Sequence, residues 1–297
     1  MIRIGTRKSA LALWQANQVK DKLDKLGATT TLVPVESEGD QNLTDPLYKM
    51  GIQGIFTKTL DSALLNEKID IAVHSLKDVP TEMAKGIQIS AVLARGAHQD
   101  VIVYHSKKEI NKVIGTGSLR RKAQWLRKYP EYKVENLRGN IQKRLEKLDQ
   151  SSWTGAIFSQ AGIERLGLSS INYEPLDWMI SAPAQGVVGI ASLNSNSEIQ
   201  SYLRKINCEQ TELCVKVERT FLNILEGGCT APIGAYSKIK NNTLVFKGGL
   251  FSLDGKEAIT VNNQIPLNQH KEFGEKAARK ILKQGGVSLL KKIKSKV

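Results

Sequence analysis

The segment GTGSLRR, residues 115–121, joins a glycine-rich turn to a serine and two adjacent arginines. The apolar spacing that follows predicts a helix, with Ser118 at its N-cap and Arg120 and Arg121 in its first turn. The outward-pointing N–H groups and the dipole of a helix make such an end a binding site for anions. Cations are unfavourable there unless a negative group lies between them. The segment therefore indicates an anion site, although a solvated side chain explains any one arginine taken alone.

The arginines are concentrated in the middle of the chain, whereas the lysines are scattered over predicted helix surfaces. Six of the twelve arginines lie between residues 120 and 165. In LRGNIQKRL and AGIERLGL, Arg138, Arg144 and Arg165 each follow a predicted strand. Planar guanidinium groups are favoured where carboxylates or phosphates are bound in a bidentate way. Five arginines arranged in this manner favour a site for a polyanionic ligand.

Two further motifs lie at predicted strand ends in the first hundred residues. Arg7 and Ser9 follow the strand MIRIGT, where parallel sheets bind ligands. Lys77 and Asp78 follow the buried strand IDIAVHSL. One interpretation is an acid positioned by a strand end and kept ionised by the lysine; the alternative is a surface ion pair. His74 is expected to be structural.

The three cysteines differ in their surroundings. Cys229, in LEGGCTAPIG, follows the end of a predicted helix, where the dipole should not lower a thiol pKa. This argues against a rapidly cycling thiolate and leaves a slow, permanent modification open. Cys208 and Cys214 are expected to be small buried hydrophobes. An odd number of cysteines without metal-binding spacing favours a reducing compartment and predicts no metal site.

Three groups of elements must position these side chains. Strands alternate with helices through residues 1–96, and the pattern restarts over residues 97–182, which predicts two α/β lobes. A return of the chain to the first lobe at about 187–207 would give two crossovers and a cleft. Residues 211–297 predict an α+β domain in which a helix precedes three antiparallel strands and a last helix covers about 270–283. The strand GAIFSQAGI is expected to cover 155–163.

Bulk composition narrows the class of protein. The 297 residues are 41% hydrophobic and 24% charged, as in soluble globular proteins. No apolar stretch fits a signal peptide or a membrane span, so the expected location is the cytoplasm and no membrane partner is expected. The net charge of +14 suggests a protein that binds nucleic acid. Against that reading, aromatic residues make up only 6% and the arginines lie at strand ends rather than along one helix.

Six motifs in order resemble the porphobilinogen deaminase (hydroxymethylbilane synthase) family: IGTRKSALALWQ, VHSLKDVPTE, IGTGSLRRKAQ, LRGNIQKRL, AGIERLGL and LEGGCTAPIGAY. The resemblance implies two lobes like those of periplasmic binding proteins, followed by a C-terminal α+β domain. It also implies a monomeric transferase of tetrapyrrole (haem) biosynthesis. Such enzymes join four porphobilinogens head to tail, release ammonia, and free hydroxymethylbilane by hydrolysis. The chain grows on a dipyrromethane cofactor, joined by a thioether to the cysteine that matches Cys229.

The resemblance also implies roles for individual residues. The carboxylate of Asp78 would contact pyrrole N–H groups and stabilise the cation left when ammonia departs. The residues that would bind carboxylates of the cofactor or substrate are Arg7, Ser9, Lys77, Ser118, Arg120, Arg121, Arg138, Arg144 and Arg165. Phe56 matches an aromatic residue near the site, with core packing as an equal alternative. Gln185 lies in a segment that resembles the family's glutamine-glycine hinge.

Several positions depart from the family pattern. In SAPAQGVVGIASLNSNSEI, Ala184 replaces a glycine, and the neighbourhood of Ala191 lacks the usual acidic and basic pair. The other crossover, RGAHQD, lacks the proline and arginine that the family usually has there. Thr59 occupies a position where the family commonly has an acidic residue, and Lys143 one where it has a threonine. These departures bear on lobe motion rather than on the reaction. The rival hypothesis is a non-catalytic two-lobe protein that binds a small polyanion, which would need neither the third domain nor Cys229.

Overall fold

The computed structural model describes residues 1–36, 57–105, 111–168, 170–225 and 231–296. These residues form two compact units. The first unit contains the described residues within 1–96 and 186–212, and the second contains those within 97–185 and 213–297. The first unit is therefore built from two stretches that are far apart in the sequence.

The first unit is an α/β lobe, here called the first lobe. Its strands are β1 (Ile2–Arg7), β2 (Thr30–Val35), β3 (Ile71–Ser75), β4 (Ile87–Val92) and β10 (Val188–Leu193). They form one sheet in the order β2-β1-β3-β10-β4. β1 runs parallel to β2 and β3, whereas β10 is antiparallel to β3 and β4. The carboxyl ends of β1 and β3 consequently lie at the same edge of the sheet.

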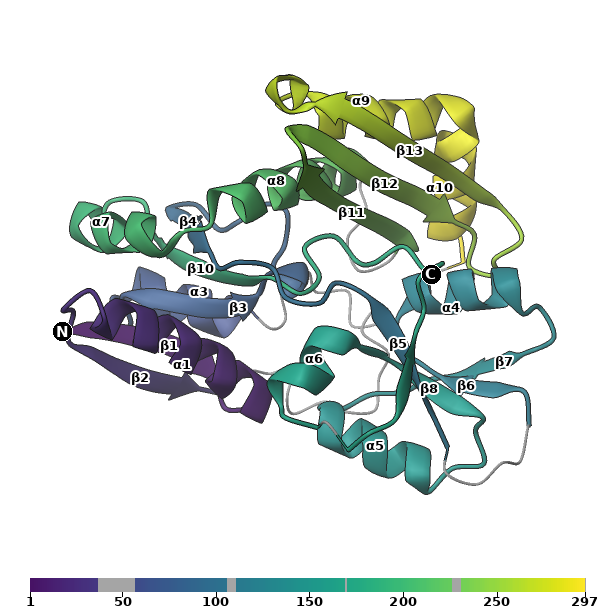
Figure 1. The fold of residues 1–297 in the computed structure, drawn as a ribbon, viewed down its shortest axis with the longest axis horizontal. Coiled ribbons are helices and arrows are strands. Elements are labelled where there is room, and N and C mark those ends of the chain that lie inside the picture. Colours follow the sequence, from purple (N-terminus) through teal and green to yellow (C-terminus); the bar gives the residue numbers. More distant parts are fainter. Residues whose placement is uncertain (37–56, 106–110, 169, 226–230, 297) are drawn as a thin grey trace. The chain divides into compact units, whose positions relative to one another are not determined.

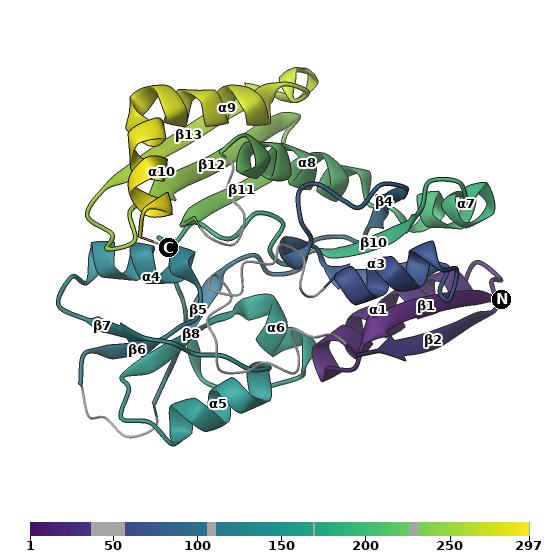
Figure 2. The same ribbon diagram turned by 180° about the vertical axis from the view of Figure 1, so that it is seen from behind.

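Helices cover both faces of this sheet (Figures 1 and 2). They are α1 (Ala10–Asp24), α3 (Lys58–Leu65) and α7 (Ser197–Ile206). Apolar residues of α1 and α7 share one core with Ile4 of β1, and those of α3 share a second core with Ala72 of β3. The helix α1 begins where the sequence predicts, because the Ser9 side chain accepts a hydrogen bond from the N–H of Ala12.

The second unit contains another α/β lobe, here called the second lobe. Its strands are β5 (Asp100–Tyr104), β6 (Val113–Gly115), β7 (Lys133–Glu135), β8 (Gly155–Ser159) and β9 (Tyr173–Pro175), in the order β7-β6-β8-β5-β9. β6 is parallel to β7 and β8, and β5 is antiparallel to β8 and β9. The helices are α4 (Leu119–Lys128), α5 (Ile141–Asp149) and α6 (Gln160–Arg165). Trp125 of α4 packs in one core, and Leu148 of α5 with Ile163 of α6 in another.

The C-terminal domain completes the second unit. Its elements are α8 (Glu209–Ile224), whose first four residues belong to the first unit, β11 (Ile233–Lys240), β12 (Thr243–Phe251), β13 (Ala258–Pro266), α9 (Phe273–Ile281) and α10 (Val287–Lys294). The three strands form an antiparallel sheet. Asn241 and Asn242 have φ angles of 48° and 56°, as expected for a two-residue hairpin turn. The rings of Phe221, Phe246 and Phe273 meet edge to face in the core.

Several contacts between described residues join this domain to the second lobe. The ring of His98 stacks on that of Tyr236 in β11, with 3.6 Å between centroids. The N–H of Ala235 donates to the carbonyl oxygen of Ser181. The Oε2 atom of Glu218, a fully buried residue of α8, accepts a hydrogen bond of 2.7 Å from the N–H of Ala184. Because Ala184 has a φ of +61°, this bond holds it in a conformation that favours glycine.

The predicted fold class is confirmed: two α/β lobes and a C-terminal α+β domain with a small antiparallel sheet. Two element predictions were wrong. The strand expected over 155–163 ends at Ser159, where α6 begins. The last helix, expected over 270–283, covers Phe273–Ile281, and after Gly285 at φ +105° the chain forms a further helix, α10. No helix within the described ranges is long and apolar enough to cross a membrane.

Candidate functional site

A pocket opens at the carboxyl ends of β1 and β3 in the first lobe. Its volume is about 80 Å³. Arg7 ends β1, Ser9 caps α1, and Asp78 lies on the single 3₁₀ turn that follows β3. The residues that line it are Arg7, Ser9, Leu11, Ala12, Gln15, Thr57, Val73, His74, Ser75 and Asp78. The structure thus brings together three of the residues singled out from the sequence, whereas Lys77 is not among the lining residues.

The polar side chains of this pocket differ in their exposure to solvent and in their hydrogen bonds. Nε2 of Gln15 donates to Oγ of Ser75 at 2.8 Å. Asp78 is exposed, so its carboxylate reaches solvent. His74 is only 5% exposed, and its Nε2 atom has no hydrogen-bond partner within the described part of the chain. Burial, together with the positive charge of Arg7, lowers the pKa of His74 to about 4. The pocket therefore combines a guanidinium group, a carboxylate and a neutral imidazole.

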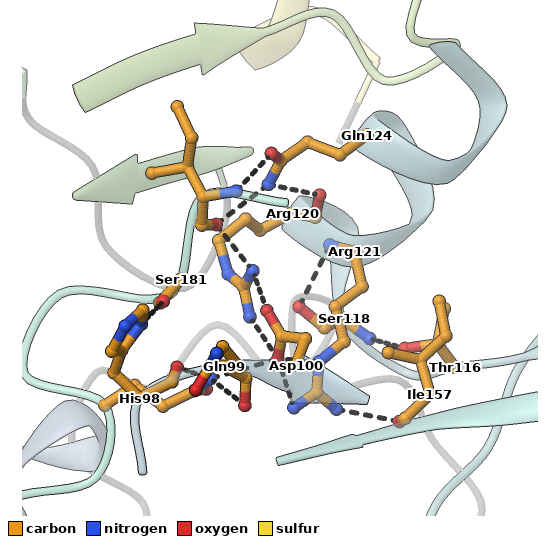
Figure 3. A network of polar contacts seen from close by, with 12 residues as sticks. His98, Gln99, Asp100, Thr116, Ser118, Arg120, Arg121, Gln124, Ile157 and Ser181 are labelled. Carbon is orange, nitrogen blue, oxygen red and sulfur yellow. Dashed lines mark hydrogen bonds and ion pairs between the residues drawn. The ribbon is translucent and has the colours of Figure 1, made fainter. Parts of the chain in front are cut away.

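The two adjacent arginines of the second lobe bind one buried carboxylate (Figure 3). Arg120 donates to Oδ2 and Oδ1 of Asp100 at 2.6 and 3.2 Å, and Nε of Arg121 donates to Oδ1 at 2.8 Å. Arg120 also donates to the carbonyl of Ile180, and Arg121 to that of Ile157. Asp100 is fully buried and both arginines are about 5–6% exposed. One anion near the start of α4 is therefore a residue of this chain.

Electrostatics in this network favour the ionised carboxylate. Burial alone raises the pKa of Asp100, but the charges of Arg120 and Arg121 outweigh it and hold that pKa well below its usual range. Gln185 adds a hydrogen bond of 3.1 Å from Nε2 to Oδ1 of Asp100. Ser118 caps α4 by accepting from the N–H of Arg121. Within the described ranges, the guanidinium groups of Arg120 and Arg121 thus both contact the single carboxylate of Asp100.

The other predicted arginines follow strands of the same sheet. β7, β6 and β8 are parallel, so the segments that follow them lie at one edge. Arg138 follows β7, is buried, and lies beside Gly117, where an added Cβ would be 3.6 Å from its Cδ. Nε of Arg144 donates to the carbonyl of Gly139 at 2.7 Å. Arg165 ends α6, where burial lowers its pKa. Ligand binding by these residues stays a prediction.

The predictions for Phe56 and Cys229 fall outside the described residues. One residue of these sites, Asp100, was missed in the sequence. Asp100 opens the apolar strand DVIVY, and a carboxylate at the start of a buried strand is the signal that would have found it. His74 was expected to be structural, which explains its burial but not its unpartnered Nε2 atom.

Family models match almost the whole chain. The model described as "Porphobilinogen deaminase, dipyromethane cofactor binding domain" matches residues 2–201. The model described as "Porphobilinogen deaminase, C-terminal domain" matches residues 212–283. Together they include both lobes and most of the C-terminal domain.

Three curated relatives agree with these models. Porphobilinogen deaminase of Desulforamulus reducens is 36% identical over 99% of this chain and 98% of its own length. That of Desulfitobacterium hafniense is 38% identical, with the same two coverages of 99% and 98%. The probable porphobilinogen deaminase of Methanocaldococcus jannaschii is 43% identical over 86% of this chain and 89% of its own.

Solved structures add a distant likeness. The periplasmic VFT2 domain of Bordetella pertussis BvgS covers 69% of this chain and 86% of its own, at 11% identity and a TM-score of 0.43. A likeness at that level carries no argument about function. The family models and the curated relatives decide the assignment: this chain belongs to the porphobilinogen deaminase family.

Proposed function

We propose that this chain is a transferase that deaminates porphobilinogen and joins four such molecules head to tail into hydroxymethylbilane, which hydrolysis then releases. In each addition the C–N bond of an aminomethyl group breaks and ammonia leaves. The methylene carbon that has lost ammonia then forms a C–C bond to the free ring carbon of the last pyrrole in the growing chain. That ring carbon loses a proton. The observation that carries the proposal within the structure is the first-lobe pocket, where Arg7 and Asp78 lie together at two strand ends.

The polar groups of this pocket suit dipyrromethane, a pair of linked pyrroles with N–H groups and carboxylate side chains. The guanidinium of Arg7 can pair with a carboxylate, and the carboxylate of Asp78 can accept from N–H groups. Cys229 is the proposed point of attachment. When bound, the cofactor supplies the pyrrole carbon on which the product chain begins.

Asp78 is the proposed catalytic residue. Its exposed position on a turn anchored by β3 lets the carboxylate face a pyrrole ring whose carboxylate substituent enters the pocket. A fixed negative charge there stabilises the positive charge that develops as ammonia leaves. The same carboxylate can hold the ring N–H and thereby orient the reacting carbon.

The arginines of the second lobe are the proposed partners of the growing chain. A chain of six pyrroles carries about twelve carboxylates, and each charge-assisted hydrogen bond is worth roughly 1.5–3 kcal/mol. The place of Arg120 and Arg121 in the first turn of α4 supports this role, because the N-terminus of a helix favours anions. Arg138, Arg144 and Arg165 support it too, because they lie on the segments that follow β7 and β8, two strands of one parallel set.

The proposal extends to the setting of the enzyme. We propose that the enzyme is a cytoplasmic monomer that binds neither nucleic acid nor membranes. Its proposed domains are residues 1–96 plus about 187–207, residues 97–182 and residues 211–297. The rival hypothesis of a non-catalytic polyanion-binding protein is not favoured, because the match to the family includes its C-terminal domain.

Ammonia release tests this function. The purified full-length chain, given porphobilinogen, should release ammonia and form a product that closes spontaneously to a uroporphyrin. Asp78→Ala should fold normally, because the side chain is exposed, yet release ammonia at least about a hundredfold more slowly. Cys229→Ser should be inactive. The absence of ammonia release by well-folded protein would refute the proposed function.

A further inference from the structure

His74 occupies an unusual position for a histidine with a structural role. It is the fourth residue of β3, pairs with Gly189 of β10 and is 5% exposed. Its neighbour Ser75 is bonded to Gln15, so the pocket wall beside it is hydrogen-bonded within the protein. Nε2 of His74 is buried and has no partner among the described residues. A buried polar atom without a partner is costly, and such atoms are rare in folded proteins.

The other residues of the pocket that His74 lines identify the chemistry of a ligand that could bind there. His74 lines the first-lobe pocket with Arg7, whose positive charge acts on the imidazole. An anion that pairs with Arg7 therefore comes near His74 as well. A neutral imidazole can donate one N–H bond to such an anion without adding a second charge. The cavity of about 80 Å³ has room for a few water-sized groups, which suits one carboxylate substituent rather than a chain of rings.

We propose that His74 is a carboxylate-binding residue, whose Nε2–H holds a side-chain carboxylate of a pyrrole ring together with Arg7. The inference rests on the proposed function, because that function supplies the pyrrole carboxylates. Each side chain then binds the part of the ligand that its own hydrogen-bonding chemistry allows. Asp78 accepts the ring N–H, whereas Arg7 and His74 donate to the carboxylate.

A structural role and a binding role predict opposite results for the ligand-free protein. If Nε2 is unsatisfied until a ligand arrives, an apolar side chain of similar size should leave the ligand-free protein equally or more stable. If the imidazole were instead a satisfied part of the core, the same change should lower the melting temperature. His74→Leu is the variant that separates the two, and His74→Gln retains an amide N–H near the position of Nε2.

The experiment uses the full-length chain in two forms. Protein from cells that make no porphobilinogen gives the melting temperature without cofactor. Protein from ordinary cells gives the cofactor content by intact mass, and then KM and kcat for porphobilinogen. His270→Leu is the matched control, because its imidazole already interacts with the carbonyl of Leu267. A fall in cofactor content would place the bound carboxylate on the cofactor, and a rise in KM would place it on the substrate.

The inference predicts that His74→Leu keeps or raises the melting temperature of the cofactor-free protein. It also predicts a loss of cofactor or a roughly tenfold higher KM, with His74→Gln within about threefold of the unchanged chain. With ¹⁵N-labelled histidine, binding should shift Nε2 of His74 more than any nitrogen of the three other histidines. An unshifted His74 signal overturns the inference, and so does a His74→Leu variant with normal KM and cofactor content. Failure of the unchanged chain to release ammonia is a separate result that overturns the proposed function itself.

Discussion

The change Asp100→Asn tests how the second lobe accommodates two buried arginines. Asp100 is fully buried and accepts hydrogen bonds from Arg120, Arg121 and Gln185 at 2.6–3.2 Å. Asparagine keeps one acceptor oxygen but removes the charge that two guanidinium groups share. Because arginine does not deprotonate in proteins, both cations would stay buried and lose the opposite charge of Asp100. Removal of one partner from a buried ion pair costs about 3–5 kcal/mol, and we expect a loss of that size.

Urea denaturation at pH 7 measures this loss. Asp177→Asn is the matched control, because Asp177 is exposed and accepts only from Gln99 among its described hydrogen bonds; its effect should stay below about 0.5 kcal/mol. A loss below about 1 kcal/mol for Asp100→Asn would refute the reasoning.

The dependence of folding stability on acidic pH tests the same network a second time. Because the folded-state pKa of Asp100 lies below the unfolded value, its ionisation stabilises the fold above about pH 4. That contribution fades as the pH falls below this value. The Asn variant should therefore lose less stability on acidification below pH 4 than the unchanged chain.

Two further predictions concern single residues. Ala184→Gly should stabilise the chain by about 0.5–1 kcal/mol in urea denaturation, because φ is +61° and relief of left-handed strain exceeds the entropy cost of glycine; a destabilised variant would contradict this. For His74, the folded pKa of about 4 lies below the reference value of 6.5, so the unfolded state binds a proton first as the pH falls. The free energy of unfolding should decline by up to about 3 kcal/mol as the pH falls from 6.5 to 4, and His74→Leu should flatten that decline. Parallel stability curves against pH for the variant and the unchanged chain would show that His74 is not the cause.

The sequence predicted features that depend on local chemistry. Ser9 and Ser118 were identified as N-caps because a hydroxyl before an apolar helical pattern satisfies nearby backbone N–H groups, and both accept such bonds. The hairpin at Asn241 and Asn242 was predicted because asparagine tolerates positive φ. The two lobes followed from strands that alternate with helices.

Features that depend on distant partners were not predictable in the same way. The carboxylate bound by Arg120 and Arg121 belongs to Asp100, twenty residues earlier, and only the sheet brings it to α4. The start of α6 at Gln160 was missed because AGI reads as a buried strand or a buried helix equally well. The unpartnered state of His74 depends on every side chain around it, which no spacing pattern reports.

The central claim is that this chain carries a permanent two-pyrrole group on Cys229. Intact mass spectrometry of freshly purified, full-length protein tests it most directly. We predict one dominant species, heavier than the bare polypeptide by the mass of a covalent dipyrromethane, and the bare mass for Cys229→Ser. Active, undegraded protein that shows only the mass of the bare polypeptide would contradict the account.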